Sequence, residues 1–255
     1  MTGIEGLKDK RILVTGGTKG IGLAIAQCFL ETGAKVVVCA RNPPESLPHV
    51  KDAEALFHQT DIRDAQSRES LVAFVQTALG GLDVLINNAG GSPPVEAATV
   101  SPRFSQAIIE LNLLAPLHLS QGFNSIMQKQ ESGGLIINIA SISGLRPSPG
   151  TAAYGAAKAG LINLTQSLAM EWAPRVRLLS VSPGPILTDE FKAHLKESDT
   201  LNKITDTIPL GRLGTPKEVA DICVFAASTS GTYLSGTNIR IDGGGEFPPT
   251  YQRVP

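Results

Sequence analysis

The chain has 255 residues, of which 42% are hydrophobic and 18% are charged, so it can bury a sizeable core and disorder is not expected. Its net charge of −1 and the lack of a basic block exclude the cationic surface that neutralises nucleic-acid phosphates. No apolar run reaches the roughly 18 residues of a membrane span and the first residues lack the apolar stretch of a signal peptide, which predicts a soluble cytoplasmic protein.

Short, nearly continuous apolar runs alternate along the chain with longer segments of helical pattern. Runs without polar alternation are typical of strands that are buried on both faces, as in a parallel sheet covered by helices. In chain order, the expected strands are 11–15, 35–39, 55–60, 83–86, 135–140, 177–182 and 238–241. The expected helices are 20–31, 64–79, 102–130, 152–172 and 216–228.

This alternation from end to end predicts a doubly wound α/β fold, a parallel sheet of about seven strands with helices on both faces and right-handed crossovers. No repeat or linker divides the chain, so residues 1–255 are expected to form a single domain. Residues 185–210 break the pattern with scattered apolar side chains on a charged background. They follow the carboxyl end of a strand, where such sheets bind ligands, so we expect a mobile lid; an ordinary pair of surface helices is the alternative.

Glycines cluster where the first strand meets the first helix, in the sequence TGGTKGIG at 15–22. They permit a tight turn and let the backbone approach a pyrophosphate at the positive end of the helix. Their spacing, Gly16-x-x-x-Gly20-x-Gly22, differs from the common G-x-G-x-x-G fingerprint. Two more breaks follow later strands and face the same crevice, at Asn87-Asn88-Ala89-Gly90 and Pro183-Gly184.

Tyr154 and Lys158 lie four residues apart, which places both side chains on one face of the expected helix. A phenol has an unperturbed pKa near ~10, and a neighbouring ammonium favours the phenolate and lowers that pKa. The pair therefore has the chemistry of a tuned proton donor and acceptor. Taken alone, the same spacing also occurs between ordinary helix residues, so the rest of the chain must decide.

The three cysteines, Cys28, Cys39 and Cys223, lie far apart among apolar residues, which predicts buried reduced thiols. The four histidines show no metal-ligand spacing with each other or with the cysteines. We therefore expect no metal site.

Together, these motifs resemble the short-chain dehydrogenase/reductase family over nearly the whole chain. The resemblance implies a Rossmann-type fold and hydride transfer between a nicotinamide and a carbonyl or secondary alcohol. The matching residues are Thr15, Gly16, Gly20, Gly22, Asp61, Asn87, Asn88, Ala89, Gly90, Asn112, Ser141, Tyr154, Lys158, Pro183, Gly184 and Thr188.

The resemblance implies four catalytic residues. Tyr154 would pass a proton to or from the substrate oxygen, and Ser141 would hydrogen-bond that oxygen. Lys158 would bind the nicotinamide ribose and depress the pKa of Tyr154. Asn112 would help to hold a water that links Lys158 to solvent, and it could also repair a local irregularity in its helix. Ser143 rivals Ser141 by composition, although a turn-forming serine is the simpler interpretation.

The resemblance also implies the nucleotide site, with Asp61 as the acceptor at the adenine edge. Ala40 stands where NAD-preferring members have Asp, and Arg41 and Lys19 would bind a 2′-phosphate. We therefore expect NADP(H) to be preferred over NAD(H); two solvated surface cations are the alternative. The cofactor-binding residues would be Gly16, Thr18, Lys19, Gly20, Ile21, Gly22, Arg41, Asp61, Ile62, Asn88, Ala89, Gly90, Tyr154, Lys158, Pro183, Gly184, Ile186 and Thr188.

The substrate wall is expected to be apolar, which suits a small hydrophobic ketone or alcohol: a 3-oxoacyl thioester, a steroid or an aromatic ketone. Arg146 could serve a substrate carboxylate, although a surface role is simpler. The family usually assembles as a tetramer, so a homotetramer or homodimer is expected, and the tail 246–255 would close a neighbouring site or lie disordered. The expected wall residues are Ile142, Leu145, Pro147, Pro185, Ile186, Phe191 and Leu195.

Three other functions stay open. An NAD-dependent secondary-alcohol dehydrogenase would use the same residues with the other nucleotide. A nucleotide-sugar epimerase or dehydratase shares the Tyr-Lys pair but resembles a longer chain with a second domain. A non-catalytic NADP-binding sensor typically loses a catalytic residue, whereas Ser141, Tyr154 and Lys158 are all present here.

Overall fold

A computed structural model describes residues 5–194 and 198–247 of the chain. Seven parallel strands form one sheet in the order β5-β2-β1-β6-β7-β8-β9, as expected from the sequence. The order reverses between β1 and β6, and at such a switch point doubly wound sheets bind their ligands. The strands are β1 (Arg11–Thr15), β2 (Lys35–Ala40), β5 (Leu56–Gln59), β6 (Val84–Asn87), β7 (Gly134–Ile139), β8 (Val176–Pro183) and β9 (Asn238–Ile241).

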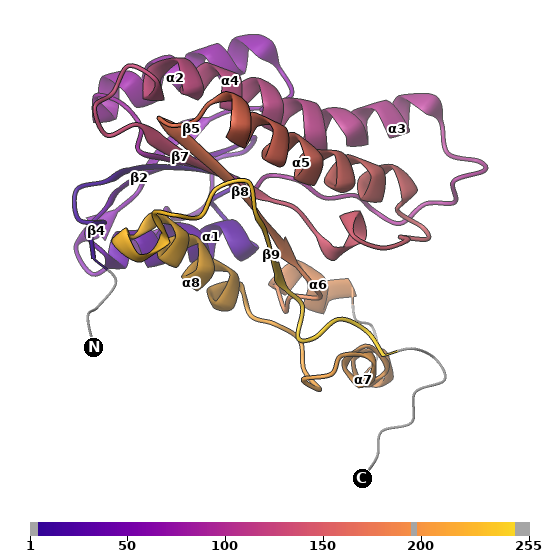
Figure 1. Cartoon of the computed structure of the whole chain (residues 1–255). Helices are drawn as coiled ribbons and strands as arrows, with labels where there is room; N and C mark the ends of the chain where they lie inside the picture. Colours follow the sequence, from indigo (N-terminus) through magenta and orange to yellow (C-terminus); the bar gives the residue numbers. More distant parts are fainter. Residues whose placement is uncertain (1–4, 195–197, 248–255) are drawn as a thin grey trace.

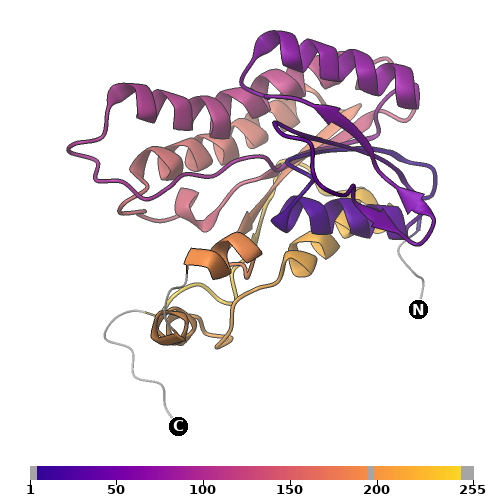
Figure 2. The same ribbon diagram turned by 180° about the vertical axis from the view of Figure 1, so that it is seen from behind.

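Helices cover both faces of the sheet (Figures 1 and 2). Successive side chains of a strand point to opposite faces, so Ile12 and Val14 of β1 join one core while Leu13 joins the other. The first core contains α1 (Gly20–Glu31) and α8 (Pro216–Ala227); the second contains α2 (Ala65–Leu79), α4 (Ala115–Met127) and α5 (Ala152–Glu171).

Side-chain caps fix the first residues of helices α2 and α8. Asp64 accepts a hydrogen bond from the backbone N–H of Ser67, so α2 begins one residue later than expected. Thr215 and Glu218 form a reciprocal capping box at α8.

The expected helix 102–130 is divided. It comprises α3 (Pro102–Ile109), a π-helical turn η1 (Glu110–Leu114) and α4. Pro116 lacks the N–H that would continue the ladder, and the buried side chain of Asn112 donates a hydrogen bond to the carbonyl of Ile108 at 2.9 Å. This confirms the expected link between Asn112 and a helix irregularity.

Residues 185–210 contain α6 (Asp189–His194) and α7 (Ser198–Thr207), which lie apart from the sheet, below β9 in the view of Figure 1. The gap at 195–197 lies outside the described residues. The structure adds a small hairpin that the sequence analysis missed, β3 (His49–Val50) with β4 (Ala53–Glu54).

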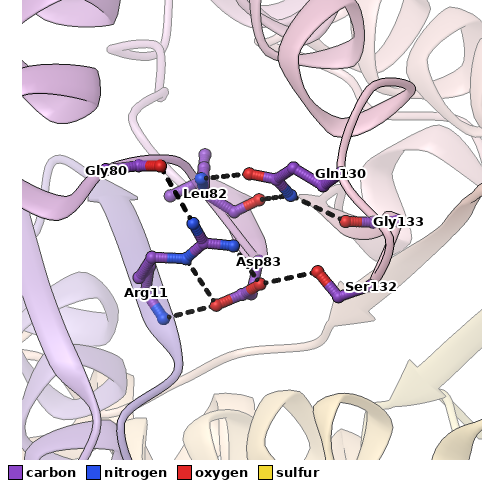
Figure 3. Close-up of polar contacts among 7 residues, drawn as sticks. All are labelled: Arg11, Gly80, Leu82, Asp83, Gln130, Ser132 and Gly133. Atoms are coloured by element: carbon purple, nitrogen blue, oxygen red, sulfur yellow. Dashed lines mark hydrogen bonds and ion pairs between the residues drawn. The ribbon is translucent and has the colours of Figure 1, made fainter.

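At the amino ends of β1, β6 and β7, hydrogen bonds join neighbouring segments (Figure 3). Arg11 donates to both carboxylate oxygens of Asp83, from Nε at 2.9 Å and from a terminal nitrogen at 2.6 Å. Gln130 accepts from the N–H of Leu82 at 2.9 Å and donates to its carbonyl at 2.8 Å. Burial raises the pKa of Asp83, but the hydrogen bonds from Arg11 outweigh it and leave that pKa lowered.

The three cysteines are buried free thiols, as expected. Burial raises the pKa of Cys39 and of Cys223 to about 12, so neither is a ready nucleophile. Among the described residues, no group of three or more His, Cys, Asp or Glu side chains is arranged to hold a metal ion. In the same part of the chain, no helix combines the length and apolar character needed to cross a bilayer.

Candidate active site

A cleft of about 1260 Å³ opens at the carboxyl ends of the strands. All eighteen residues expected to bind the cofactor line it, although they come from six separate segments of the chain. These segments are 16–22, 41, 61–62, 88–90, 154–158 and 183–188. Residues 42–46, which follow Arg41, also line the cleft and were not expected from the sequence.

The glycine-rich loop has no room for side chains at its centre. A Cβ on Gly17 would lie 2.6 Å from a methyl carbon of Val38, and one on Gly22 would lie 2.2 Å from the carbonyl oxygen of Gly16. Gly16 and Gly20 adopt positive φ angles of 62° and 54°. The loop therefore brings bare backbone and the amino end of α1 to the cleft, which fits the pyrophosphate of a dinucleotide.

Ser141 and Tyr154 meet at the other end of the cleft. Ser141 follows β7 directly and caps the short 3-10 helix η2 (Ile142–Gly144), where its Oγ accepts from the N–H of Ser143 at 3.1 Å. Tyr154 lies in the first turn of α5, near enough to Ser141 for the serine side chain to lower the pKa of the phenol. The structure thus places the expected proton donor beside the expected carbonyl-binding serine.

Lys158 lies one turn beyond Tyr154, with its Nζ 5.6 Å from the centre of the Tyr154 ring. Its side chain is 3% exposed and donates a hydrogen bond of 2.7 Å to the carbonyl of Ile139. Burial lowers the pKa of Lys158 to about 8. A buried ammonium with few partners favours its neutral form, so this cation is held at an energetic cost.

The pKa of Tyr154 differs from the expectation. Burial raises it, and the hydrogen bond with Ser141 opposes that rise only in part. Lys158 lies beside the ring and directs its hydrogen bond to Ile139, so the expected lowering by Lys158 is wrong for this structure. The low local dielectric dominates over the neighbouring charge.

Asn112 lies behind the cleft rather than on its wall. Its fully buried side chain accepts from the N–H of Gly91 at 2.9 Å and donates to the Gly91 carbonyl at 3.0 Å. A Cβ on Gly90 would lie 2.6 Å from Asn112 Oδ1 and 3.2 Å from Lys158 Nζ. Asn112 thus holds in place the backbone turn at Gly90 and Gly91, which lies next to Lys158.

At the adenine end, Asp61 is oriented by a residue that the sequence analysis missed. Arg63 donates from Nε at 2.9 Å and from a terminal nitrogen at 2.5 Å to its two carboxylate oxygens. These hydrogen bonds lower the pKa of Asp61, which stays ionised as an acceptor. The spacing Asp61-Ile62-Arg63 was the available signal.

Arg41 and Lys19 both line the nucleotide end of the cleft, and no acidic side chain occupies position 40. Arg41 is exposed. Lys19 is 75% exposed and forms an ion pair of 2.5 Å with Glu190 of α6.

The substrate wall is more polar than expected. Of the predicted wall residues, Pro185, Ile186 and Phe191 line the cleft. Ile142 is buried in the 3-10 turn, while Leu145 and Pro147 are exposed; none of the three lines the cleft, and Leu195 lies outside the described residues. The turn capped by Ser141 instead presents Ser143 to the cleft, which Ser92 and Thr151 from other segments also line.

Arg146 has the surface role that the sequence analysis favoured. It pairs with Glu246 at 2.6 Å, and it donates to the carbonyl of Pro147 at 3.0 Å. Phe247 donates its N–H to the carbonyl of Thr207 in α7. The start of the tail therefore packs against its own chain, and residues 248–255 lie outside the described residues.

Comparison with known proteins places the chain in a family. A family model described as enoyl-(acyl carrier protein) reductase matches residues 16–246. The chain is 34% identical to a 3alpha-hydroxysteroid dehydrogenase of Mediterraneibacter gnavus over 245 residues, which cover 93% of this chain and 97% of the relative. It is also 34% identical to a 3-oxoacyl-(acyl-carrier-protein) reductase of Chlamydia muridarum over 246 residues, with coverage of 93% and 98%.

Among solved structures, a 7 alpha-hydroxysteroid dehydrogenase complexed with NADH and 7-oxo glycochenodeoxycholic acid has a TM-score of 0.87 and 31% identity. The match covers 94% of this chain and 95% of that one. With the seven-stranded parallel sheet and the cleft at its switch point, these matches agree on one assignment. The chain belongs to the short-chain dehydrogenase/reductase family and is an NAD(P)-dependent oxidoreductase that acts on CH–OH groups.

Proposed function

We propose that this enzyme uses NADP(H) and transfers hydride between the nicotinamide and the carbonyl or secondary alcohol of a hydrophobic substrate. The observation that carries the proposal is the convergence of Ser141, Tyr154 and Lys158 at one end of a cleft whose other end has a bare glycine-rich loop. A nicotinamide supplies hydride chemistry when it is bound.

In this proposal, Tyr154 donates its proton to the substrate oxygen during reduction and takes it back during oxidation. The raised pKa of Tyr154 favours the protonated phenol, which is the form that reduction needs. Ser141, which lies beside Tyr154, holds the same oxygen. Lys158 binds the ribose hydroxyls next to the nicotinamide, and that contact would offset the cost of its burial.

We assign Asn112 a positioning role. It holds the backbone of Gly91 in place, and the lack of a side chain at Gly90 leaves the space between Asn112 and Lys158 open. A water held there by Asn112 would connect Lys158 to solvent and return the proton that Tyr154 gives up.

The NADP(H) preference rests on charge. Ala40 offers no carboxylate to a ribose hydroxyl, whereas Arg41 and Lys19 are two cations at the nucleotide end of the cleft. An NAD-dependent secondary-alcohol dehydrogenase is the second candidate, because the similar 7 alpha-hydroxysteroid dehydrogenase structure contains NADH. The same residues would act in both cases.

The substrate we propose is a hydrophobic ketone, either a 3-oxoacyl thioester or a steroid. Pro185, Ile186 and Phe191 give the cleft an apolar side, and the names of two relatives cover both classes. Helix α6, which carries Phe191, would act as the lid over this substrate.

We further propose a cytoplasmic homotetramer or homodimer with one catalytic domain per chain. The free thiols suit a reducing compartment. Dimerisation through η1, α4 and α5 would tie assembly to the site, because these elements carry Asn112, Tyr154 and Lys158.

The test is the rate of NADPH and NADH oxidation with a 3-oxoacyl thioester, 3- and 17-ketosteroids, a small diketone and an aryl ketone. We expect turnover of at least one ketone, faster with NADPH than with NADH at equal concentration. Faster turnover with NADH would favour the second candidate. Binding of NADPH without turnover of any ketone, repeated with a wider set of carbonyls, would contradict the enzymatic proposal and favour a nucleotide sensor.

A further inference from the structure

An ion pair crosses the nucleotide end of the cleft. Lys19 is the N-cap residue of α1, and its Nζ lies 2.5 Å from a carboxylate oxygen of Glu190 in α6. Both residues line the cleft. The other oxygen of Glu190 lies 3.4 Å from the position that a Cβ on Gly20 would occupy. The carboxylate therefore sits directly over the first turn of α1.

This position is the one in which a cofactor phosphate would compete for the same cation. The ammonium of Lys19 favours an anion at its side. Glu190 supplies that anion from within the chain. The Lys19 and Glu190 side chains are 75% and 48% exposed, and ion pairs so exposed are weak. A phosphate with a higher charge can displace the carboxylate.

We propose that Glu190 is a specificity-determining residue that restrains Lys19 until the 2′-phosphate of NADP(H) takes its place. The proposal rests on the NADP(H) preference proposed above. NAD(H) carries no 2′-phosphate, so it gains little from the release of Lys19. Glu190 thus weakens NADP(H) binding, and NADP(H) binding separates α6 from the glycine-rich loop.

The experiment is a fluorescence titration of the full chain with NADPH and with NADH, for wild type, Glu190→Gln, Lys19→Gln and the double variant. We expect Glu190→Gln to lower the Kd for NADPH about fivefold, because a weak exposed pair no longer has to be broken. The Kd for NADH should change by less than about twofold, within the range of an exposed charge change. In the Lys19→Gln background, Glu190→Gln should give no gain.

Asp189→Asn is the matched control. Asp189 neighbours Glu190 in α6, is almost fully exposed and pairs with Lys192 at 3.2 Å rather than with Lys19. This substitution removes the same charge from the same helix, so it reports any effect of net charge alone. We expect it to leave the Kd for both nucleotides unchanged.

Three results would overturn the inference: an unchanged NADPH Kd in Glu190→Gln, an equal gain for NADPH and NADH, or a gain that persists without Lys19. Lys19→Gln alone separates this failure from that of the NADP(H) preference. If Lys19→Gln weakens NADPH binding while Glu190→Gln has no effect, only the role of Glu190 is wrong. If neither Lys19→Gln nor Arg41→Ala weakens NADPH binding, the NADP(H) preference itself is wrong.

Discussion

The two edges of the sheet treat buried polar groups in opposite ways. At the amino edge, Asp83 is 9% exposed and its carboxylate accepts hydrogen bonds from Arg11 and Ser132 (Figure 3). At the carboxyl edge, Lys158 is buried with a pKa lowered to about 8, beside a cleft of about 1260 Å³. At the amino edge, the charge of Asp83 is paired with Arg11 inside the protein. At the carboxyl edge, burial disfavours the charged form of Lys158. The first arrangement supports stability, and the second is typical of a functional site.

The largest expected effect is at the carboxyl edge. Tyr154→Phe removes the proton donor and should lower kcat by about 10³-fold, within the range for loss of a general acid. The Kd for NADPH and the melting temperature should stay close to wild type, because the ring is retained. Steady-state kinetics, nucleotide titration and thermal melts of the same preparation test this. A loss of turnover below tenfold would remove Tyr154 from its assigned role.

The matching substitution at the amino edge is Asp83→Ala. It leaves Arg11, which is half-buried, without its carboxylate partner, and we expect the free energy of unfolding to fall by about 2 kcal/mol. The kcat should be unchanged at a temperature where the variant is folded. Urea unfolding measures the loss, with Asp221→Asn as control, because Asp221 forms only an exposed pair with Lys217. A variant as stable as that control would show that the ion pair between Arg11 and Asp83 contributes nothing to stability.

Arg41→Ala tests the nucleotide end of the cleft at the carboxyl edge. Removal of a charge-assisted contact to the 2′-phosphate should raise the Kd for NADPH about tenfold, or 1.4 kcal/mol, and leave that for NADH unchanged. Isothermal titration with both nucleotides measures the ratio. An equal loss of affinity for NADPH and NADH would mean that Arg41 does not bind the 2′-phosphate.

The smallest expected effect is on stability, with Lys158→Met. The folded pKa of Lys158, about 8, lies below the unfolded value near ~10.4, so the unfolded chain binds more protons between these pH values. Wild-type stability should therefore rise through this window, and below it Lys158 lowers stability. The methionine variant should be inactive but equally stable or up to about 1 kcal/mol more stable at pH 7, since the hydrogen bond to Ile139 is lost as well. Urea unfolding at pH 7 and pH 10 tests the sign; clear destabilisation at pH 7 would contradict it.

The sequence predicted the features that depend on local pattern. Buried strands read as continuous apolar runs, and all seven appear in the sheet with boundaries within two residues of expectation. The strands also predicted the position of the cleft, because parallel strands that end at one edge bring the loops after them together. Residues as distant as Gly16 and Thr188 therefore line one site.

Features that depend on contacts across space were not predicted. Nothing in the sequence near Lys19 indicates that Glu190 pairs with it, since the contact arises only when α6 folds over the loop. The 3-10 turn after Ser141 decides that Ser143 rather than Ile142 lines the cleft. The pKa of Tyr154 depends on its burial, which the spacing to Lys158 does not reveal.

Hydrogen–deuterium exchange with and without NADPH tests most directly whether the carboxyl edge binds the nucleotide while the amino edge serves stability alone. We predict that NADPH slows exchange at the carboxyl edge, in residues 16–22, 88–91 and 184–188, and leaves residues 80–83 and 130–133 at the amino edge unchanged. Protection confined to the amino edge, or no protection of the glycine-rich loop at saturating NADPH, would contradict the account.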